Sequence, residues 1–227
     1  LIGTFINLLK SNNYDYTKFD EILKRLKYGN DYIFIKIVRE IYFEYMSELK
    51  SKNEVDFNDM INDAIKVLKK GGKIKPYKYI IIDEYQDTSL TKYNMIKTIK
   101  NKTQAKLFCV GDDFQSIYRF TGCNLNIFLN FTKLIPNSTI IKLKYTYRNS
   151  EELINISSKF VMKNKSQIKK ELISNKHIDK PVEFIYYINP KKSFNKIYKS
   201  LLNKGSLLVL GRNNFDINKF SDENIPE

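Results

Sequence analysis

Two adjacent carboxylates, Asp83 and Glu84, come directly after an apolar and aromatic run at 79–82. An unbroken run of this kind, rich in Ile, is typical of a strand buried on both faces of a parallel sheet. Ligands of open α/β sheets bind beyond the carboxyl ends of the strands. We therefore expect Asp83 to offer oxygen ligands to Mg²⁺. We expect Glu84 to orient or deprotonate an attacking water.

Two further apolar runs also lead into residues with chemical uses. The run at 106–110 is followed by GDDFQSIYRFTGC at 111–123, and the run at 139–143 is followed by KYTYRNS at 144–150. A glycine followed by two aspartates indicates a tight turn that brings backbone and side chains to the edge of a sheet. The neutral amide of Gln115 can donate to a phosphate and also accept from a water.

The stretch IDEYQDT at 82–88 and the two stretches after it resemble, in this order, motifs II, III and IV of the UvrD/Rep branch of superfamily-one DNA helicases. The family patterns read DE-aromatic-QDT, GDDxQSIYxFxGA and YRS, and the first also looks like a Walker B motif. The RFTGC ending at 119–123 is most similar to the helicase IV subgroup. The strong resemblance covers about residues 56–165. It implies an α/β, RecA-like P-loop NTPase fold, with a parallel sheet flanked by helices and a helical N-terminal part.

The resemblance also implies roles in ATP hydrolysis, with ATP and Mg²⁺ as cofactors. Asp83 and Glu84 correspond to the metal-binding and water-activating pair. Gln115 corresponds to the glutamine that contacts the terminal phosphate or the attacking water and senses the nucleotide state. Arg148 corresponds to an arginine finger that reaches the γ-phosphate across a cleft between domains. Tyr147 corresponds to the tyrosine that stacks on the adenine.

Two aromatic residues, Tyr118 and Phe120, have counterparts in the family that stack on bases in the single-strand channel. The same spacing also suits a core strand. For Tyr118 core packing is an equal alternative, whereas for Phe120 stacking is favoured. Most UvrD-type sequences carry Arg where this chain has Thr121, so that phosphate contact is either lost or moved to Arg119. The implied partners are single-stranded DNA and duplex junctions.

A P-loop sequence, G-x-x-x-x-G-K-[ST], does not occur in the chain, although ATP hydrolysis by this machinery needs one to cradle the phosphates. The nearest stretch, Gly71-Gly72-Lys73, is followed by Ile74 and is better interpreted as a turn. In the family the P-loop lies well N-terminal to motif II, and this chain begins with Leu1. We therefore expect an internal fragment of a larger helicase, inactive as an ATPase by itself.

The composition indicates a polyanionic partner, because the formal net charge is +14 and the pI is about 9.5. An AT-biased genome would also enrich lysine, so the charge has modest weight. Cys109 and Cys123 have no metal-ligand spacing and suit a reduced cytosolic protein. His177 lies in a polar stretch and is expected on the surface without partners. No apolar stretch approaches the ~20 residues that span a bilayer, and we expect a cytoplasmic protein.

Helical periodicity dominates residues 1–70. One helix is expected over 31–50, with a core-facing stripe of Ile33, Ile37, Ile41 and Tyr45 that Phe34 and Val38 adjoin. A second is expected over 56–70, with Asp56 as N-cap and with Phe57, Met60, Ile61, Ala64 and Leu68 inward.

From residue 79 onward, strands and helices alternate as in α/β proteins. A helix should begin at Ser89, with Leu90, Tyr93, Ile96 and Ile99 inward. A short helix or turn is expected at 128–133, and a helix capped by Asn149 and Glu152 should run to about Lys163. The remaining expectations are a loop at 164–180, a strand at 182–187, a helix at 193–203 with Phe194, Ile197, Tyr198 and Leu201 inward, and a strand at 206–210.

The expected domains are a helical segment at 1–70 that packs on a first RecA-like domain, the C-terminal part of that domain at 71–142, and the start of a second at 143–227. The favoured function is a fragment of an ATP-dependent DNA helicase that translocates 3′ to 5′ on single-stranded DNA and unwinds duplexes. The alternative is a non-catalytic nucleic-acid-binding module derived from a helicase. A helicase–nuclease fusion of the RecB type is a third possibility, which needs a nuclease domain outside these residues.

Overall fold

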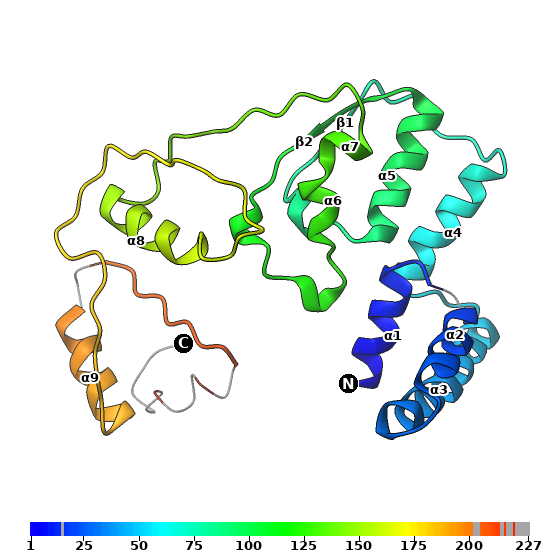
Figure 1. Ribbon diagram of the computed structural model, residues 1–227, viewed down its shortest axis with the longest axis horizontal. Helices are drawn as coiled ribbons and strands as arrows, with labels where there is room; N and C mark the ends of the chain where they lie inside the picture. The colour runs from blue at the N-terminus through cyan, green and yellow to red at the C-terminus, as the bar shows by residue number, and fades with distance from the viewer. Residues whose placement is uncertain (15, 202–204, 214–215, 217–219, 221–227) are drawn as a thin grey trace. The chain divides into compact units, whose positions relative to one another are not determined.

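The computed structural model describes residues 1–14, 16–201, 205–213, 216 and 220 of the chain (Figure 1). Its internal contacts divide the chain into two compact units. The first unit comprises residues 1–146 and 155–173, and the second comprises residues 147–154 and 174–227.

Four helices account for most of the first 70 residues, as the sequence predicts: α1 (Ile2–Ser11), α2 (Thr17–Leu26), α3 (Asn30–Lys52) and α4 (Phe57–Lys69). Helices α1 to α3 share one apolar core. Aromatic rings fill much of it, since Phe5 meets Phe34 edge-on with ring centroids 5.8 Å apart. The buried members of this core are Ile6, Leu9, Phe19, Ile35, Val38 and Tyr42.

The inward face of α3 differs from the predicted one. Its buried residues are Ile35, Val38 and Tyr42, and Phe34 and Tyr45 pack beside them. The predicted stripe is wrong at three of its four positions, because Ile33, Ile37 and Ile41 are 55%, 50% and 36% exposed. Apolar residues occur around much of this helix, so periodicity alone does not select the side on which α1 and α2 pack.

Helix α4 begins as predicted, because the Asp56 side chain accepts a hydrogen bond from the backbone N–H of Asp59 at 2.8 Å. Leu68 is buried as expected, together with Ile65. Phe57 and Met60 were also predicted to face inward, but they are 84% and 54% exposed. The helix is followed by Gly71, whose φ of +100° starts the turn predicted there.

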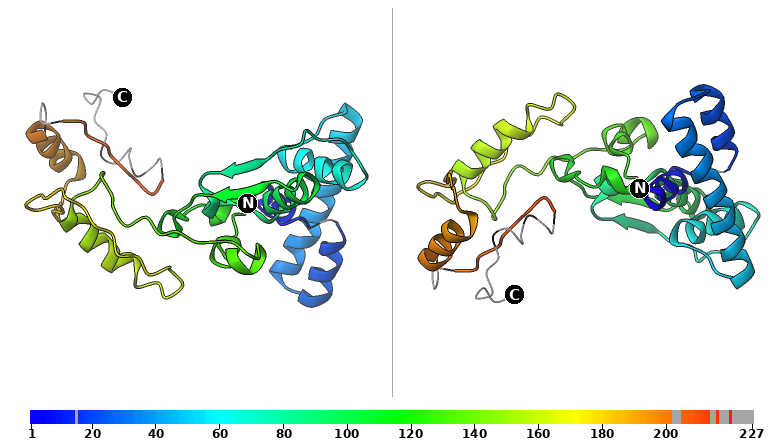
Figure 2. Two further views of the ribbon diagram at one scale, coloured as in Figure 1. Left: turned by 90° about the horizontal axis from the view of Figure 1, so that it is seen from above. Right: turned by 90° about the horizontal axis from the view of Figure 1, so that it is seen from below.

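Two strands, β1 (Tyr79–Ile82) and β2 (Lys106–Cys109), pair in parallel, with Tyr79 opposite Lys106 and Ile82 opposite Cys109. Figure 2 shows them side by side and running in the same direction. Helix α5 (Leu90–Thr103) connects them and packs along α4 (Figure 1). It begins at the predicted Ser89, whose Oγ accepts from the N–H of Lys92 at 3.3 Å.

The apolar runs predicted strands that are buried on both faces. This prediction is wrong for the described residues. Tyr79, Ile81 and Phe108 are 64%, 73% and 60% exposed. Alternate residues of the same strands are half-buried, and Ile82 and Cys109 pack against a second core that contains Tyr85, Tyr93 and Ile127. The described sheet has two strands and one covered face, so alternate side chains remain open.

The predicted strands at 139–143, 182–187 and 206–210 do not form in the described residues. A strand requires a hydrogen-bonded neighbour. Near the first of these runs, the first unit has a single bridge, between Tyr145 and Ile173. Ile141 and Leu143 are each 80% exposed. These apolar runs are therefore irregular in the structure.

The remaining helices are α6 (Leu125–Leu129), α7 (Phe131–Leu134), α8 (Glu151–Val161) and α9 (Pro190–Leu201). Helices α6 and α7 confirm the short helical stretch, and the loop at 164–180 is also confirmed. The predicted cap of α8 is wrong by one residue, because Ser150 Oγ, and not Asn149, accepts from the N–H of Leu153. The last predicted residues of the final helix, 202–203, lie outside the described residues.

Candidate active site at the strand ends

The ends of β1 and β2 bring the two acidic stretches together. The strand ladder continues past its last residues, since Val110 N–H donates to Ile82 O and Tyr85 N–H donates to Val110 O, both at 2.8 Å. As a result Asp83 and Glu84 leave the sheet beside the turn that begins at Gly111. This is the edge at which the sequence predicts a ligand site.

The turn after β1 holds Glu84 in an uncommon conformation. Its φ of 49° and ψ of 43° lie in the left-handed region, which costs a non-glycine residue about 1–3 kcal/mol. Its N–H donates to Asp83 Oδ1 at 2.9 Å, which fixes the two residues relative to each other. Both acids are exposed, so their carboxylates are accessible to a ligand.

Gln86 connects the acid pair to the second turn. Its side chain is buried, with Nε2 donating to Glu84 Oε2 at 2.7 Å and Oε1 accepting from Asp112 N–H at 3.0 Å. Gly111 makes room for it, because a Cβ there would lie 2.7 Å from Gln86 Oε1 and from a ring carbon of Phe128. The sequence indicates Gln86 only as part of the IDEYQDT stretch at 82–88. The signal in the sequence for this bridging role is the amide of Gln86, which can donate and accept hydrogen bonds at the same time.

Asp112 extends this network to the predicted phosphate sensor. Its Oδ2 accepts from Gln115 Nε2 at 2.9 Å, and its Oδ1 accepts from the N–H of Phe114 at 3.0 Å. Partial burial would raise the pKa of Asp112, but hydrogen bonds from Lys170 and Gln115, with the charge of Lys170, hold that pKa below its ordinary value. A continuous hydrogen-bonded path therefore runs from Glu84 through Gln86 and Asp112 to Gln115.

The aromatic pair lies in the loop that follows Gln115. Tyr118 and Phe120 are 47% and 65% exposed, with ring centroids 6.1 Å apart. Neither ring belongs to a core of the described residues, so the core-packing alternative for Tyr118 finds no support. The loop ends at Gly122, whose φ is +98° and where a Cβ would lie 2.0 Å from Ser11 Oγ of α1. Only glycine fits this contact without rearrangement.

Comparison with known proteins identifies the family. Residues 3–136 match the family described as UvrD/REP helicase N-terminal domain, which is more than half of the chain. The chain belongs to the UvrD/Rep helicase family.

Its curated relatives include helicases from several bacteria. It is 35% identical to DNA helicase IV of Escherichia coli (strain K12) over 147 residues, which are 64% of this chain and 22% of that protein. It is 33% identical to the ATP-dependent DNA helicase Rep of Buchnera aphidicola subsp. Acyrthosiphon pisum (strain APS), over 72% of this chain and 26% of that protein. It is 29% identical to the ATP-dependent DNA helicase PcrA of Bacillus subtilis (strain 168), over 67% and 21%. The chain thus spans between a fifth and a third of these relatives.

The motif IV residues of the family belong to the second compact unit. Tyr147 is 79% exposed, and Arg148 is exposed as well. The structure brings Asp83, Glu84 and Gln115 to one edge of the sheet within the first unit. The roles of Tyr147 and Arg148 toward a nucleotide, like those of Tyr118 and Phe120 toward DNA, stay predictions.

The donor set at the strand ends suits Mg²⁺. In the part of the chain that the structure describes, no group of three or more His, Cys, Asp or Glu residues is placed to hold a metal ion. Mg²⁺ commonly takes one or two carboxylates and completes its shell with waters and substrate phosphates. Asp83 and Glu84 provide two exposed carboxylates at the expected edge.

The described helices also include none that is long and apolar enough to cross a membrane.

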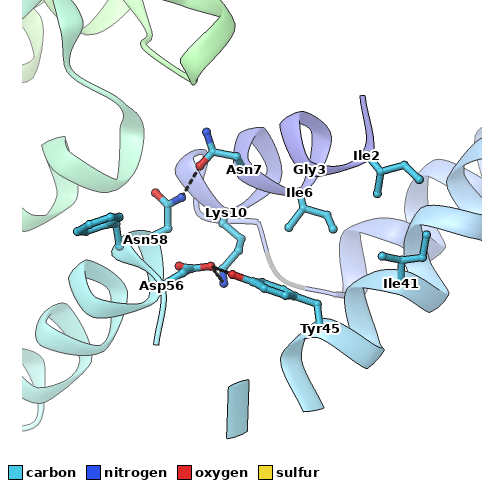
Figure 3. Close-up of a pocket in the computed structure, with 10 residues that line it drawn as sticks. Ile2, Gly3, Ile6, Asn7, Lys10, Ile41, Tyr45, Asp56 and Asn58 are labelled. Atoms are coloured by element: carbon cyan, nitrogen blue, oxygen red, sulfur yellow. Dashed lines mark hydrogen bonds and ion pairs between the residues drawn. The ribbon is translucent and has the colours of Figure 1, made fainter. Parts of the chain in front are cut away.

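A separate cavity of about 420 Å³ lies among α1, α3 and α4 (Figure 3). Its polar groups are already paired with one another, since Lys10 and Tyr45 both contact Asp56, and Asn58 donates to Asn7 at 2.8 Å. A ligand would find little unmet hydrogen bonding there, so this cavity is not the candidate site. Its lining consists of Ile2, Gly3, Ile6, Asn7, Lys10, Ile41, Tyr45, Asp56, Phe57 and Asn58.

Proposed function

We propose that this chain is part of an ATP-dependent DNA helicase that uses Mg²⁺-ATP hydrolysis to move 3′ to 5′ along single-stranded DNA and to unwind duplexes. Family membership and the names of the relatives support the enzyme class. The observation that carries the proposal is the hydrogen-bonded path from Glu84 to Gln115, the residues that we propose as the water-activating acid and the phosphate sensor. We also propose a RecA-like fold. Its parts are a helical segment at 1–70, the C-terminal part of a first domain at 71–142 and the start of a second domain at 143–227.

In the proposed reaction Asp83 and Glu84 would hold Mg²⁺, which would neutralise charge on the phosphates. Gln86 donates to one oxygen of Glu84, Oε2, and so fixes the plane of the carboxylate. The other oxygen, Oε1, then accepts a hydrogen bond from the attacking water and removes its proton. Gln115 contacts the γ-phosphate or this water through its amide.

Two further groups act on the nucleotide and the DNA. Arg148 stabilises charge on the γ-phosphate in the transition state, and Tyr147 stacks on the adenine. Tyr118 and Phe120 stack on bases of the single strand. Because Gln115 lies in the same short loop as both aromatic rings, a change of nucleotide state at Gln115 moves the base-stacking surface.

The test is ATP hydrolysis by the intact protein that carries this chain, measured with and without single-stranded DNA. Replacing the proposed base, Glu84→Gln, should lower kcat by about 10²- to 10⁴-fold, the usual contribution of a general base. Glu54→Gln is the matched control, because Glu54 is an exposed acid between α3 and α4.

Two results would contradict the proposal. One is hydrolysis that survives Glu84→Gln undiminished. The other is an intact protein that binds single-stranded DNA but hydrolyses no ATP, which would favour the non-catalytic nucleic-acid-binding module.

A further inference from the structure

Lys170, in a stretch that the sequence indicated only as a polar loop, contacts three consecutive residues of the family's motif III. Its Nζ forms ion pairs with the carboxylates of Asp112 and Asp113 and lies 4.2 Å from the centre of the Phe114 ring. The backbone of the same stretch adds a contact, because Ile168 N–H donates to Asp113 Oδ2 at 2.7 Å. This stretch and motif III both belong to the first compact unit.

The two carboxylates have different surroundings. The Asp113 side chain is fully buried, and a buried carboxylate needs a paired positive charge, which Lys170 supplies. The Asp112 side chain is 36% exposed and has contacts that lead into the candidate site. Lys170 and the N–H of Phe114 both contact its Oδ1, and this leaves Oδ2 directed at Gln115.

We propose that Lys170 is a positioning residue for Gln115, which it orients through the Asp112 carboxylate. The inference rests on the proposed function, because it concerns the glutamine that senses the γ-phosphate. With Lys170 in place, Asp112 Oδ1 is held by the ammonium group as well as by the N–H of Phe114, and the carboxylate is held more firmly than by that N–H alone. Gln115 Nε2 then has a fixed acceptor, and its carbonyl oxygen and second N–H are directed toward the nucleotide. Without Lys170, only the N–H of Phe114 holds Asp112 Oδ1, so the carboxylate and the Gln115 amide sample more orientations.

A merely structural role must be separated from positioning, because Lys170→Met leaves Asp113 buried without its counter-charge. The double variant Lys170→Met with Asp113→Asn removes this burden while Asp112 still lacks its lysine. Lys170→Arg keeps the charge and can reach both carboxylates. Lys169→Met is the matched control, since Lys169 is the exposed neighbour.

The experiment measures thermal unfolding, and kcat and KM for ATP with saturating single-stranded DNA, in the intact protein. Lys170→Met should lower kcat by about 10- to 100-fold, the scale of a misplaced reacting group, with KM for ATP changed less than about twofold. The double variant should recover the unfolding temperature but not kcat. Lys170→Arg should recover most of kcat, and Lys169→Met should match the unmodified protein.

The outcomes separate this inference from the proposed function. If the double variant regains both stability and kcat, Lys170 is structural and the inference is overturned. Unchanged kcat in Lys170→Met, with normal hydrolysis by the unmodified protein, also overturns it and leaves the proposed function intact. Absence of hydrolysis in the unmodified protein overturns the proposed function, and the positioning role with it.

Discussion

Two lysines in the first compact unit each pair with two aspartates, yet they serve different ends. Lys10 of α1 contacts Asp56 and Asp59, both at 2.5 Å, and its side chain is 3% exposed. Lys170 contacts Asp112 and Asp113, and its side chain is 19% exposed. In both clusters one ammonium group pairs with two carboxylates. What differs is the set of groups that the carboxylates contact next.

Around Lys10 the carboxylate of Asp56 makes its further contacts with groups of the helices themselves. Asp56 caps α4 and also accepts from the hydroxyl of Tyr45 at 3.0 Å. Burial, followed by this hydrogen bond, raises the pKa of Tyr45 to about 12. Around Lys170 the contacts continue through Asp112 to Gln115, and through the backbone of Asp112 to Gln86. The same ion-pair chemistry thus fastens helices in one place and orients a candidate catalytic group in the other.

Lys10→Met should have the largest effect of the three changes, and this effect should be on folding stability. It leaves two carboxylates without their shared partner, and we expect a loss of about 3 kcal/mol in the free energy of unfolding, the lower end for a broken buried pair. The kcat of the folded fraction should not change. Chemical denaturation measures the first quantity and ATP hydrolysis the second. Lys66→Met is the control, because Lys66 pairs with Asp63 on the surface of α4. A fall in kcat as large as that expected for Lys170→Met would show that the two clusters do not differ in kind.

Tyr45→Phe is a smaller change in the same cluster. It removes one hydrogen bond to a charged acceptor that is partly exposed, so we expect about 1 kcal/mol of destabilisation and no change in kcat. Tyr32→Phe on the same helix is the control, since its ring lies under Lys36 at 5.7 Å and its hydroxyl is not part of the Asp56 cluster. Equal unfolding midpoints for the two variants would show that the Tyr45 hydroxyl contributes nothing.

The sequence predicted what depends on local pattern and chain order. Both paired strands, the helix between them and the caps at Asp56 and Ser89 follow from periodicity and capping chemistry. The placement of Glu84 and Gln115 at the same edge of the sheet follows from parallel strands that end there. Lys170 could not be predicted, because a lysine in a polar loop has no periodicity, and its partners lie far away in the chain. The inward side of α3 and the unformed strands depend on which surfaces meet, and sequence pattern does not encode that.

His177 provides an exposed counterpart to the two lysines, within the second compact unit. It was expected to have no partners, but its Nδ1 lies 2.8 Å from Glu152 Oε1, and its side chain is 66% exposed. Hydrogen bonding to Glu152, followed by the charge of that residue, raises the pKa of His177 above its ordinary value of 6.5. Hydrogen bonds from His177 and from backbone N–H groups lower the pKa of Glu152 to about 2.

The sign of the pH effect follows from these directions. The pair contributes stability below pH 6.5, where the imidazole is charged in both the folded and the unfolded state, and this contribution is lost as the pH rises through the raised pKa. It should be the smallest of the three effects, because water and salt screen exposed charges. His177 is the single histidine of the chain, so its proton NMR signals in a pH titration need no further assignment. Glu152→Gln should return the pKa toward 6.5, whereas Glu183→Gln, at another exposed acid, should leave it raised. If His177 titrates at its ordinary value in the unmodified chain, water and salt screen the exposed pair completely, and the pair adds nothing to stability.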